Sequence, residues 1–372
     1  MKIERWLAPE MIFSDGRLST NLAAGIQAET VISLSPIKDI PHGAQIDKVS
    51  GVLCPGFIDL QVNGAGGLLF NKSPTVATQR QMRKTLHAFG TYGILPTCIT
   101  DTVEVLENCA AAAIDAKRED GILGIHIEGP HISQERRGTH SAADIRPFDD
   151  ATRRILRQLR DHDIFTKITI APEAITPNEI SNLVEMGVFV AIGHTAASLD
   201  ETKAAIDAGA RGFTHLFNAM PPIVNRDPGP VIAALNSDAY CGLIGDGIHV
   251  NYDVLRVALR AHAHKDRMYF VSDAMPTVGG PDQFDLYDQT IHVKNDRLVN
   301  DEGSLAGAHI SQRDNVQRAV QYLDVSLEDA LKMAIMIPAE ILGKPELGSV
   351  QNRPLGDLIT SDDTFNRIKF LS

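Results

Sequence analysis

Cysteine is scarce in this sequence, and the few cysteines follow no pattern. The 372 residues include four, Cys54, Cys98, Cys109 and Cys241, without a CxxC pair or a regular spacing. Neither a disulfide framework nor a cysteine zinc site is therefore expected. Buried thiols in a reducing cytoplasm are the ordinary interpretation of such cysteines.

Long apolar stretches are also missing. No segment approaches the roughly 18 consecutive apolar residues that a membrane span needs. The first six residues, MKIERW, carry three charged side chains, so they lack the apolar core of a signal peptide. We therefore expect a cytoplasmic protein without a membrane partner.

Positive charge is in deficit. Lysine and arginine total 35 against 47 aspartates and glutamates, which gives a net charge of −12. Nucleic acid is not an expected partner, because clustered basic residues supply most of the affinity for a phosphate backbone. An anionic small molecule would need a few local donors that act against the overall field, so an arginine near a candidate site is informative.

What is present describes an ordinary globular chain. Hydrophobic residues make up 44% and charged residues 22%, with 29 glycines, which excludes disorder, collagen and a coiled coil. The length suggests two or three domains, or one large domain with a small one. The glycines after Asn63 form no nucleotide-binding motif, because Leu69 interrupts GxGxxG and no Walker A lysine motif exists.

The middle of the chain alternates short apolar runs with amphipathic helical patterns. Ser198 and Glu201, for example, have the spacing of a capping box at a helix start. Two further helices are expected after the last run, over 312–322 and 327–337, the second ended by Pro338. The eight strand-like runs are 52–62, 94–100, 122–128, 168–171, 188–194, 212–216, 241–245 and 268–273.

These units predict an α/β protein with a closed, TIM-like (β/α)8 barrel, because the runs are apolar enough to be buried on both faces. Both chain ends have short β-like runs but are too short to hold a core alone. We therefore predict that residues 1–54 and 342–372 pair into one small β-sandwich domain, and that residues 55–341 form the barrel.

Catalytic side chains of such barrels lie at the carboxyl ends of the strands. Glu128, His194 and His215 lie at the carboxyl ends of the third, fifth and sixth runs, and barrel geometry would bring them together as two imidazoles and one carboxylate. That is the ligand set of a catalytic zinc with one open position. A histidine that merely bonds within its loop is the alternative for each residue alone, and His126 is equally well explained as a packed core histidine.

Asp273 is the last residue of the eighth run and is placed to act as a general acid and base. Hydrolysis of an amide needs a group that takes a proton from water and returns it to the leaving amine. The alternative is an aspartate that caps a helix.

Eight segments, in this order along nearly the whole chain, resemble the N-acetylglucosamine-6-phosphate deacetylases of the amidohydrolase superfamily. Any one of them is weak, but together they are specific. They are Pro55-Gly56-Phe57-Ile58-Asp59, His126-Ile127-Glu128-Gly129-Pro130, Gly193-His194-Thr195, Thr214-His215-Leu216-Phe217-Asn218-Ala219-Met220, Arg226-Asp227-Pro228-Gly229, Asp246-Gly247-Ile248-His249, Ser272-Asp273-Ala274 and Leu305-Ala306-Gly307.

The resemblance implies hydrolysis of the acetamide of N-acetylglucosamine 6-phosphate to glucosamine 6-phosphate and acetate. It assigns Glu128, His194 and His215 to the metal, Asp273 to acid and base catalysis, and His140 to polarising the acetamide carbonyl. It also implies a homodimer in which a neighbouring subunit completes the phosphate pocket. The implied substrate-binding residues are Thr139, Asn218, Ala219, Arg226, His249, Leu305, Ala306 and Gly307.

The sequence departs from the superfamily pattern at three places. Gln61 and Asn63 replace the His-x-His pair that binds a second metal, so one divalent ion per subunit is expected, zinc first and iron(II) as the alternative. Lys167 lies at the start of the fourth strand and is not expected to bridge metals. Ala308 follows Leu305-Ala306-Gly307 where serine is common in the family, which leaves the stereochemistry of the sugar open.

Three other functions remain as alternatives. The first is the same reaction on the galactosamine epimer. The second is a cyclic amide hydrolase or nucleobase deaminase, which usually needs the histidine pair that is missing here. The third is a degenerate barrel kept for binding, against which the complete ligand set and Asp273 argue.

Overall fold

The protein is described here from a computed structural model, which covers residues 3–300, 303 and 305–371. Its centre is a sheet of eight parallel strands, hydrogen-bonded in the order β15-β14-β13-β12-β11-β10-β9-β6. The strands are β6 (Phe57–Val62), β9 (Thr91–Ile99), β10 (Ile125–Glu128), β11 (Thr166–Ile170), β12 (Phe189–Ile192), β13 (Gly212–Phe213), β14 (Tyr240–Leu243) and β15 (Met268–Phe270).

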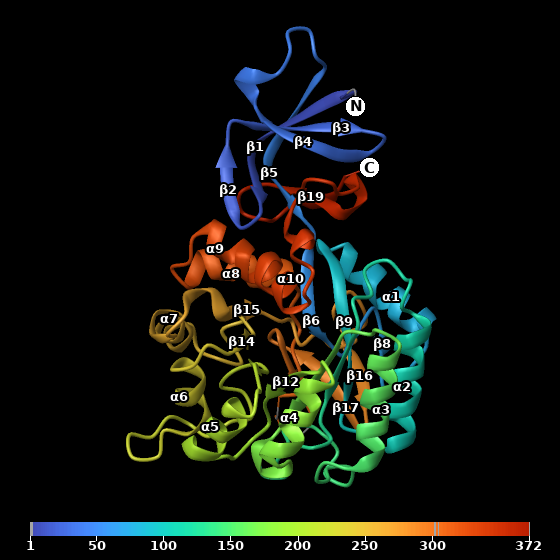
Figure 1. The fold of residues 1–372 in the computed structure, drawn as a ribbon, viewed down its shortest axis with the longest axis vertical. Coiled ribbons are helices and arrows are strands. Elements are labelled where there is room, and N and C mark those ends of the chain that lie inside the picture. The colour runs from blue at the N-terminus through green and yellow to red at the C-terminus, as the bar shows by residue number, and fades with distance from the viewer. Residues whose placement is uncertain (1–2, 301–302, 304, 372) are drawn as a thin grey trace.

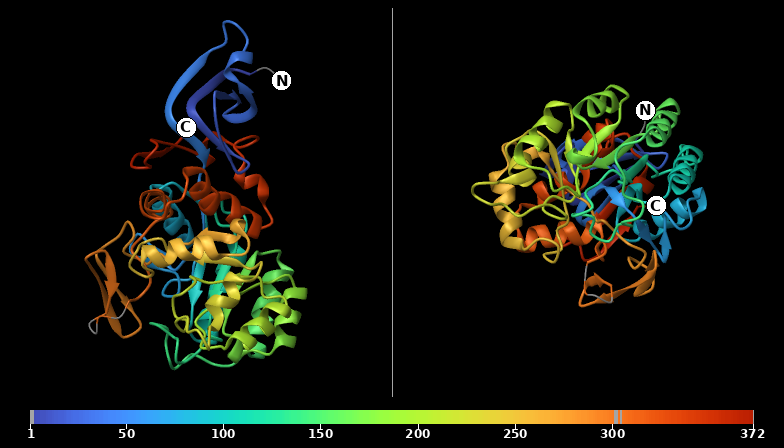
Figure 2. Two further views of the ribbon diagram at one scale, coloured as in Figure 1. Left: turned by 90° about the vertical axis from the view of Figure 1, so that its left-hand side faces the viewer. Right: turned by 90° about the horizontal axis from the view of Figure 1, so that it is seen from below.

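The sheet closes on itself just beyond β15. Val62 and Ala274 form a parallel bridge, and the Asn63 amide donates to the Ala274 carbonyl at 2.9 Å. Helices surround the strands (Figures 1 and 2), so the predicted (β/α)8 barrel is confirmed. These helices are α1 (Val76–His87), α2 (Val103–Asp115), α3 (Asp150–Asp161), α4 (Pro177–Glu185), α5 (Leu199–Asp207), α6 (Gly229–Leu235), α7 (Tyr252–Ala261) and α8 (Gln312–Tyr322).

The capping box predicted from Ser198 and Glu201 starts α5. The prediction that Pro338 ends a helix is wrong. α9 (Leu327–Leu331) continues through a π-helical turn into α10 (Ile337–Ile341), with Pro338 in the first turn of α10. Because α10 continues directly from the π-helical turn, the missing N–H of Pro338 falls where the chain already departs from regular α-helical hydrogen bonding.

Both chain ends build a second sheet above the barrel (Figure 1). The first expected run, 52–62, is two strands, because the chain leaves this sheet at Gly56 and enters the barrel. A Cβ atom on Gly56 would lie 2.6 Å from the Cβ of Tyr92, so the crossing requires glycine. The strands of this sheet are β1 (Arg5–Ser14), β2 (Arg17–Thr20), β3 (Leu22–Gln27), β4 (Thr30–Pro36), β5 (Ile46–Pro55), β19 (Leu358–Ser361) and β20 (Ile368–Phe370).

The two ends of the chain share an apolar core in this sheet. β19 pairs antiparallel with β5, and Leu358 packs in one buried cluster with Leu53 and Ile26. We propose that residues 1–54 and 342–372 form one folding unit beside the barrel of residues 55–341.

An insertion that the sequence analysis missed follows β15. It is a three-stranded antiparallel sheet of β16 (Gln283–Leu286), β17 (Gln289–Lys294) and β18 (Arg297–Val299), which lies beside the barrel in Figure 2. Its own cluster, which includes Leu286, Ile291 and Leu298, packs on Ile99 and Met275 at the barrel mouth. Among the described residues, no helix is long and apolar enough to cross a membrane.

The pairing of β5 with β19 predicts a difference between two glycine variants. Gly51 and Gly43 both have a positive φ, +78° and +83°, but only a Cβ at Gly51 would overlap the backbone of Ser361. Gly51→Ala should lower the free energy of unfolding by about 2–4 kcal/mol, because strain and overlap add. Gly43→Ala, the matched control, should lower it by only about 1 kcal/mol. Equal losses in denaturant unfolding would contradict the pairing of the two chain ends.

Candidate active site

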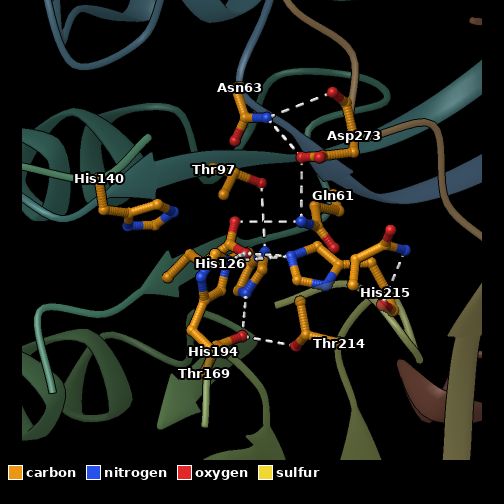
Figure 3. A network of polar contacts seen from close by, with 12 residues as sticks. Gln61, Asn63, Thr97, His126, His140, Thr169, His194, Thr214, His215 and Asp273 are labelled. Carbon is orange, nitrogen blue, oxygen red and sulfur yellow. Dashed lines mark hydrogen bonds and ion pairs between the residues drawn. The ribbon is translucent and has the colours of Figure 1, made fainter. Parts of the chain in front are cut away.

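The three predicted metal ligands meet at the carboxyl end of the barrel. Glu128 ends β10, while His194 and His215 each lie two residues beyond the ends of β12 and β13. The Nε2 atoms of His194 and His215 are 3.2 and 3.0 Å from Glu128 Oε1 and 3.1 Å from each other. All three side chains are buried, and Figure 3 shows both imidazoles directed toward one point.

Hydrogen bonds prepare these groups to bind a cation. His194 Nδ1 donates to the Arg136 carbonyl at 2.9 Å, so the Nε2 lone pair is free to face its neighbours. Burial alone would raise the pKa of Glu128, but the adjacent imidazoles of His194 and His215 hold that pKa well below its usual range. Two imidazole nitrogens and a carboxylate oxygen that converge in this way form a possible metal-binding triad.

The backbone at these positions is in the left-handed region. His194, His215 and Asp273 have φ values of +47°, +30° and +52°, which residues with a Cβ atom rarely adopt. Such strain persists only where the surrounding structure enforces it. The turns after the strands therefore aim these side chains across the barrel mouth.

Asp273 lies beside the triad and is held by two amides. Asn63 Nδ2 donates to its Oδ1 at 2.6 Å, and Gln61 Nε2 donates to the same atom at 3.0 Å. Gln61 Nε2 also lies 3.0 Å from Glu128 Oε2, and Figure 3 shows Gln61 and Asn63 beside Asp273. Burial and the nearby Glu128 raise the pKa of Asp273, which suits a group that must accept and then release a proton.

His126 belongs to the barrel core. Its ring nitrogens lie 3.3 Å from Thr97 Oγ1 and 2.7 Å from Thr169 Oγ1, and the side chain is fully buried. Lys167 is the second residue of β11, as expected at the start of that strand. Burial lowers the pKa of its ammonium to about 8.

A cavity of about 210 Å³ opens over the triad and Asp273. Most of the residues assigned to catalysis and substrate binding line it, whereas Ala306 is packed inside the apolar cluster of the inserted sheet. Ala308 is also buried, in a bridge to Ala274, and does not line the cavity. The predicted residues on the wall are Thr139, His140, Asn218, Ala219, His249, Leu305 and Gly307.

His140 and His249 are fixed from behind. His140 Nδ1 lies 2.7 Å from Thr100 Oγ1, and burial together with the nearby His194 lowers its pKa to about 3. His249 Nδ1 lies 2.6 Å from Asp246 Oδ2. Asp246 is partly desolvated, which alone would raise its pKa, but the bond to His249 keeps that pKa low.

Arg226 is the predicted site residue that lies apart. It is exposed and does not line the cavity of its own chain. It belongs to the loop before α6, which extends away from the barrel in Figure 1. Two apolar residues of this loop, Ile223 and Val224, are 50% and 47% exposed.

Sequence reasoning missed the apolar wall of the cavity, which is formed by Ile99, Ile244 and Met275. Ile99 ends β9, Ile244 follows β14, and Met275 follows the Ser272-Asp273-Ala274 segment. Each therefore lies at a strand end, and in a barrel of this kind that position alone indicates that a residue can line the cavity.

Comparison with known proteins gives the same picture. A profile of the Amidohydrolase family matches residues 52–370. The N-acetylgalactosamine-6-phosphate deacetylase of Shewanella sp. (strain ANA-3) is 39% identical over 351 residues, which cover 93% of this chain and 87% of that protein. The N-acetylglucosamine-6-phosphate deacetylase of Haemophilus influenzae is 33% identical over 356 residues, which cover 94% and 92%.

Solved structures share the fold over nearly the whole chain. N-acetylglucosamine-6-phosphate deacetylase from Pasteurella multocida has a TM-score of 0.89 at 33% identity and covers 97% of this chain and 96% of its own. An aspartate-to-alanine variant of the Mycobacterium smegmatis enzyme, solved with N-acetyl-D-glucosamine-6-phosphate, has a TM-score of 0.89 at 28% identity, with coverage of 98% and 96%. The chain therefore belongs to the amidohydrolase family, among relatives that are deacetylases of N-acetylated amino-sugar 6-phosphates.

Proposed function

We propose that this protein is a metal-dependent deacetylase that converts N-acetylglucosamine 6-phosphate to glucosamine 6-phosphate and acetate. The observation that carries this proposal is a carboxylate, Asp273, held by two amides at 2.6 and 3.0 Å in the same cavity as the triad. Relatives with this activity cover most of the chain. Four buried free cysteines accord with a reducing cytoplasm as its location.

Glu128, His194 and His215 would hold one divalent ion, zinc or alternatively iron(II), since both accept imidazole and carboxylate ligands. When bound, the ion supplies Lewis-acid activation of the water and the amide. A single ion is favoured because Gln61 and Asn63, at the positions of the missing histidine pair, direct amide N–H groups at Asp273. An N–H donor offers no lone pair to a second metal.

Asp273 takes a proton from the attacking water at its carboxylate and returns it to the amine that leaves. Its Oδ1 is engaged by Gln61 and Asn63, so Oδ2 is the atom suited to this transfer. His140, on the opposite wall, donates a hydrogen bond to the acetamide oxygen, where negative charge develops. Thr139, Leu305 and Gly307 line the space for the sugar ring, and Ala306 supports that wall from the apolar cluster behind it.

The phosphate would be bound by His249, Asn218 and the backbone near Ala219, with Arg226 from a second subunit. The exposed position of Arg226 and the exposed Ile223 and Val224 beside it support this arrangement, because apolar residues of this kind are suited to a protein interface. A homodimer would then bring each loop to its neighbour's cavity. A positively charged side chain such as Arg226 is needed beside the phosphate because the chain as a whole carries a net charge of −12.

A second candidate is the same reaction on N-acetylgalactosamine 6-phosphate. It is favoured by the 39% identity to the Shewanella relative with that name, against 33% for the Haemophilus relative named for the glucosamine epimer. The replacement at Ala308 does not discriminate, because this residue is buried outside the cavity wall.

The two candidates are separated by kcat/KM on both epimers, each with and without the 6-phosphate. We expect the glucosamine 6-phosphate derivative to be the best substrate and the free sugars to be poor ones, because they lack the charged group. A higher kcat/KM for the galactosamine derivative would establish the second candidate. No acetate release from any of the four would reject both.

Asp273→Asn should lower kcat by about 10²–10⁴-fold, since an amide cannot accept the proton. One divalent ion per chain should remain bound, as in the parent protein, because Asp273 is not a ligand in this proposal. Asp282→Asn, an exposed change in the same stretch of chain, is the control and should leave kcat unaltered. Near-normal turnover in Asp273→Asn with metal bound would exclude the acid and base role.

Arg226→Ala should raise KM for the phosphorylated sugar by about 10–100-fold, the loss of one charge-assisted contact, without changing kcat/KM for the free sugar. If Arg226 acts on the neighbouring subunit, mixing Arg226→Ala chains with Asp273→Asn chains will restore activity, because each mixed dimer regains one intact site. If the mixture is no more active than its components, Arg226 either contributes to the cavity of its own chain or does not contact the substrate.

A further inference from the structure

The inserted sheet reaches the active site through a tyrosine at its first turn. Tyr287 lies between β16 and β17 and has a φ of +52°, a strained conformation for a residue with a large side chain. Its hydroxyl donates to the Thr100 carbonyl at 2.6 Å. The sheet is also anchored to the end of β9, because Leu286, Ile291 and Leu298 share an apolar cluster with Ile99.

Thr100 connects this contact to the cavity. It follows β9 directly and is fully buried. Its hydroxyl oxygen is 2.7 Å from His140 Nδ1 and 3.4 Å from the Glu128 carbonyl. At 3.4 Å the contact with the carbonyl is longer than the roughly 2.5–3.0 Å that is usual for a hydroxyl hydrogen bond to oxygen, so the Thr100 hydroxyl proton is better placed in the 2.7 Å contact with His140 Nδ1.

This contact decides what His140 can do to a substrate. A neutral imidazole has one N–H, and the other nitrogen can only accept. When Nδ1 accepts the Thr100 hydroxyl proton, the ring N–H is at Nε2 and can be donated to an acetamide oxygen. When Nδ1 holds the proton itself, Nε2 offers a lone pair, which repels that oxygen.

We propose that Thr100, held by Tyr287, is a positioning residue that keeps the proton of His140 on Nε2. The inference rests on the proposed function for the identity of the acceptor, but the contacts that carry it belong to the protein alone. The His140 ring is packed against His194, with 4.4 Å between ring centroids, so it has little room to rotate and exchange its nitrogens. The inserted sheet thereby contributes to catalysis through Tyr287, although Tyr287 does not line the cavity over the triad.

Thr100→Val removes the hydroxyl and keeps the shape of the side chain. We expect kcat to fall about 10–100-fold, the usual effect of losing a group that orients a catalytic histidine, with KM nearly unchanged. Thr100→Ser should restore most of kcat. Tyr287→Phe should give a smaller loss in the same direction. Two substitutions at the start of the same strand are the matched controls, and both should leave kcat unaltered. Thr91→Val removes a buried hydroxyl that has no hydrogen-bond partner among the described residues. Tyr92→Phe removes a hydroxyl that bonds Asp120 at 3.0 Å.

A double-mutant cycle and a spectrum separate positioning from folding. The double variant Thr100→Val/His140→Gln should have the same kcat as His140→Gln alone, because both substitutions remove the same interaction, the donation from His140 Nε2 to the acetamide oxygen. In metal-loaded protein labelled with 15N-histidine, the His140 signals should report an Nε2–H ring in the parent and lose this preference in Thr100→Val.

Multiplicative losses in the cycle, wild-type kcat in Thr100→Val, or an unchanged spectrum would each overturn the proposal. Failure of the proposed function is a distinct outcome. It would be seen as no acetate release by the parent protein, while the spectrum would still report the role of Thr100 in placing the ring proton.

Discussion

Closure of the parallel sheet is the constraint on which this structure depends. The last bridge joins Val62, at the end of the first barrel strand, to Ala274, beyond the eighth. Because the strands are parallel, closure places all eight carboxyl ends on one rim. It also sets Gln61 and Asn63 directly beside Asp273, so the bond that completes the barrel and the contacts that fix the proposed acid and base are formed by neighbouring residues.

The site combines burial with opposite charge in a confined space. Desolvation opposes the ionised forms of Glu128 and Asp273, yet Glu128 remains anionic because two imidazoles face it. Burial and the negative charge of Glu128 raise the pKa of Asp273, and the hydrogen bond from Asn63 offsets only part of that rise. Two carboxylates on one rim thus have different tendencies to bind a proton, which is what a ligand and a proton carrier require.

The sequence alone predicted the barrel, the triad and the place of Asp273, because buried parallel strands are apolar runs and the site residues follow those runs directly. It did not predict the inserted sheet, although Phe284, Leu286, Ile291 and Val293 alternate with polar residues there, since short strands give weak patterns. The sequence also did not predict that Gln61 bonds both Glu128 and Asp273, because Asp273 lies 212 positions away along the chain. The exposed setting of Arg226 depends on the path of a loop, which local patterns do not specify.

The second sheet has a consequence for how the chain is made. β5 lies between β1 and β19 in that sheet, so one edge of β5 has no partner until residues 358–361 have been synthesised. The N-terminal strands leave the ribosome first and must wait for the entire barrel to be translated. Throughout that interval an unpaired, apolar edge is open to neighbouring nascent chains. A ribosome-associated chaperone that covers strand edges would therefore influence the yield of this protein more than its final stability.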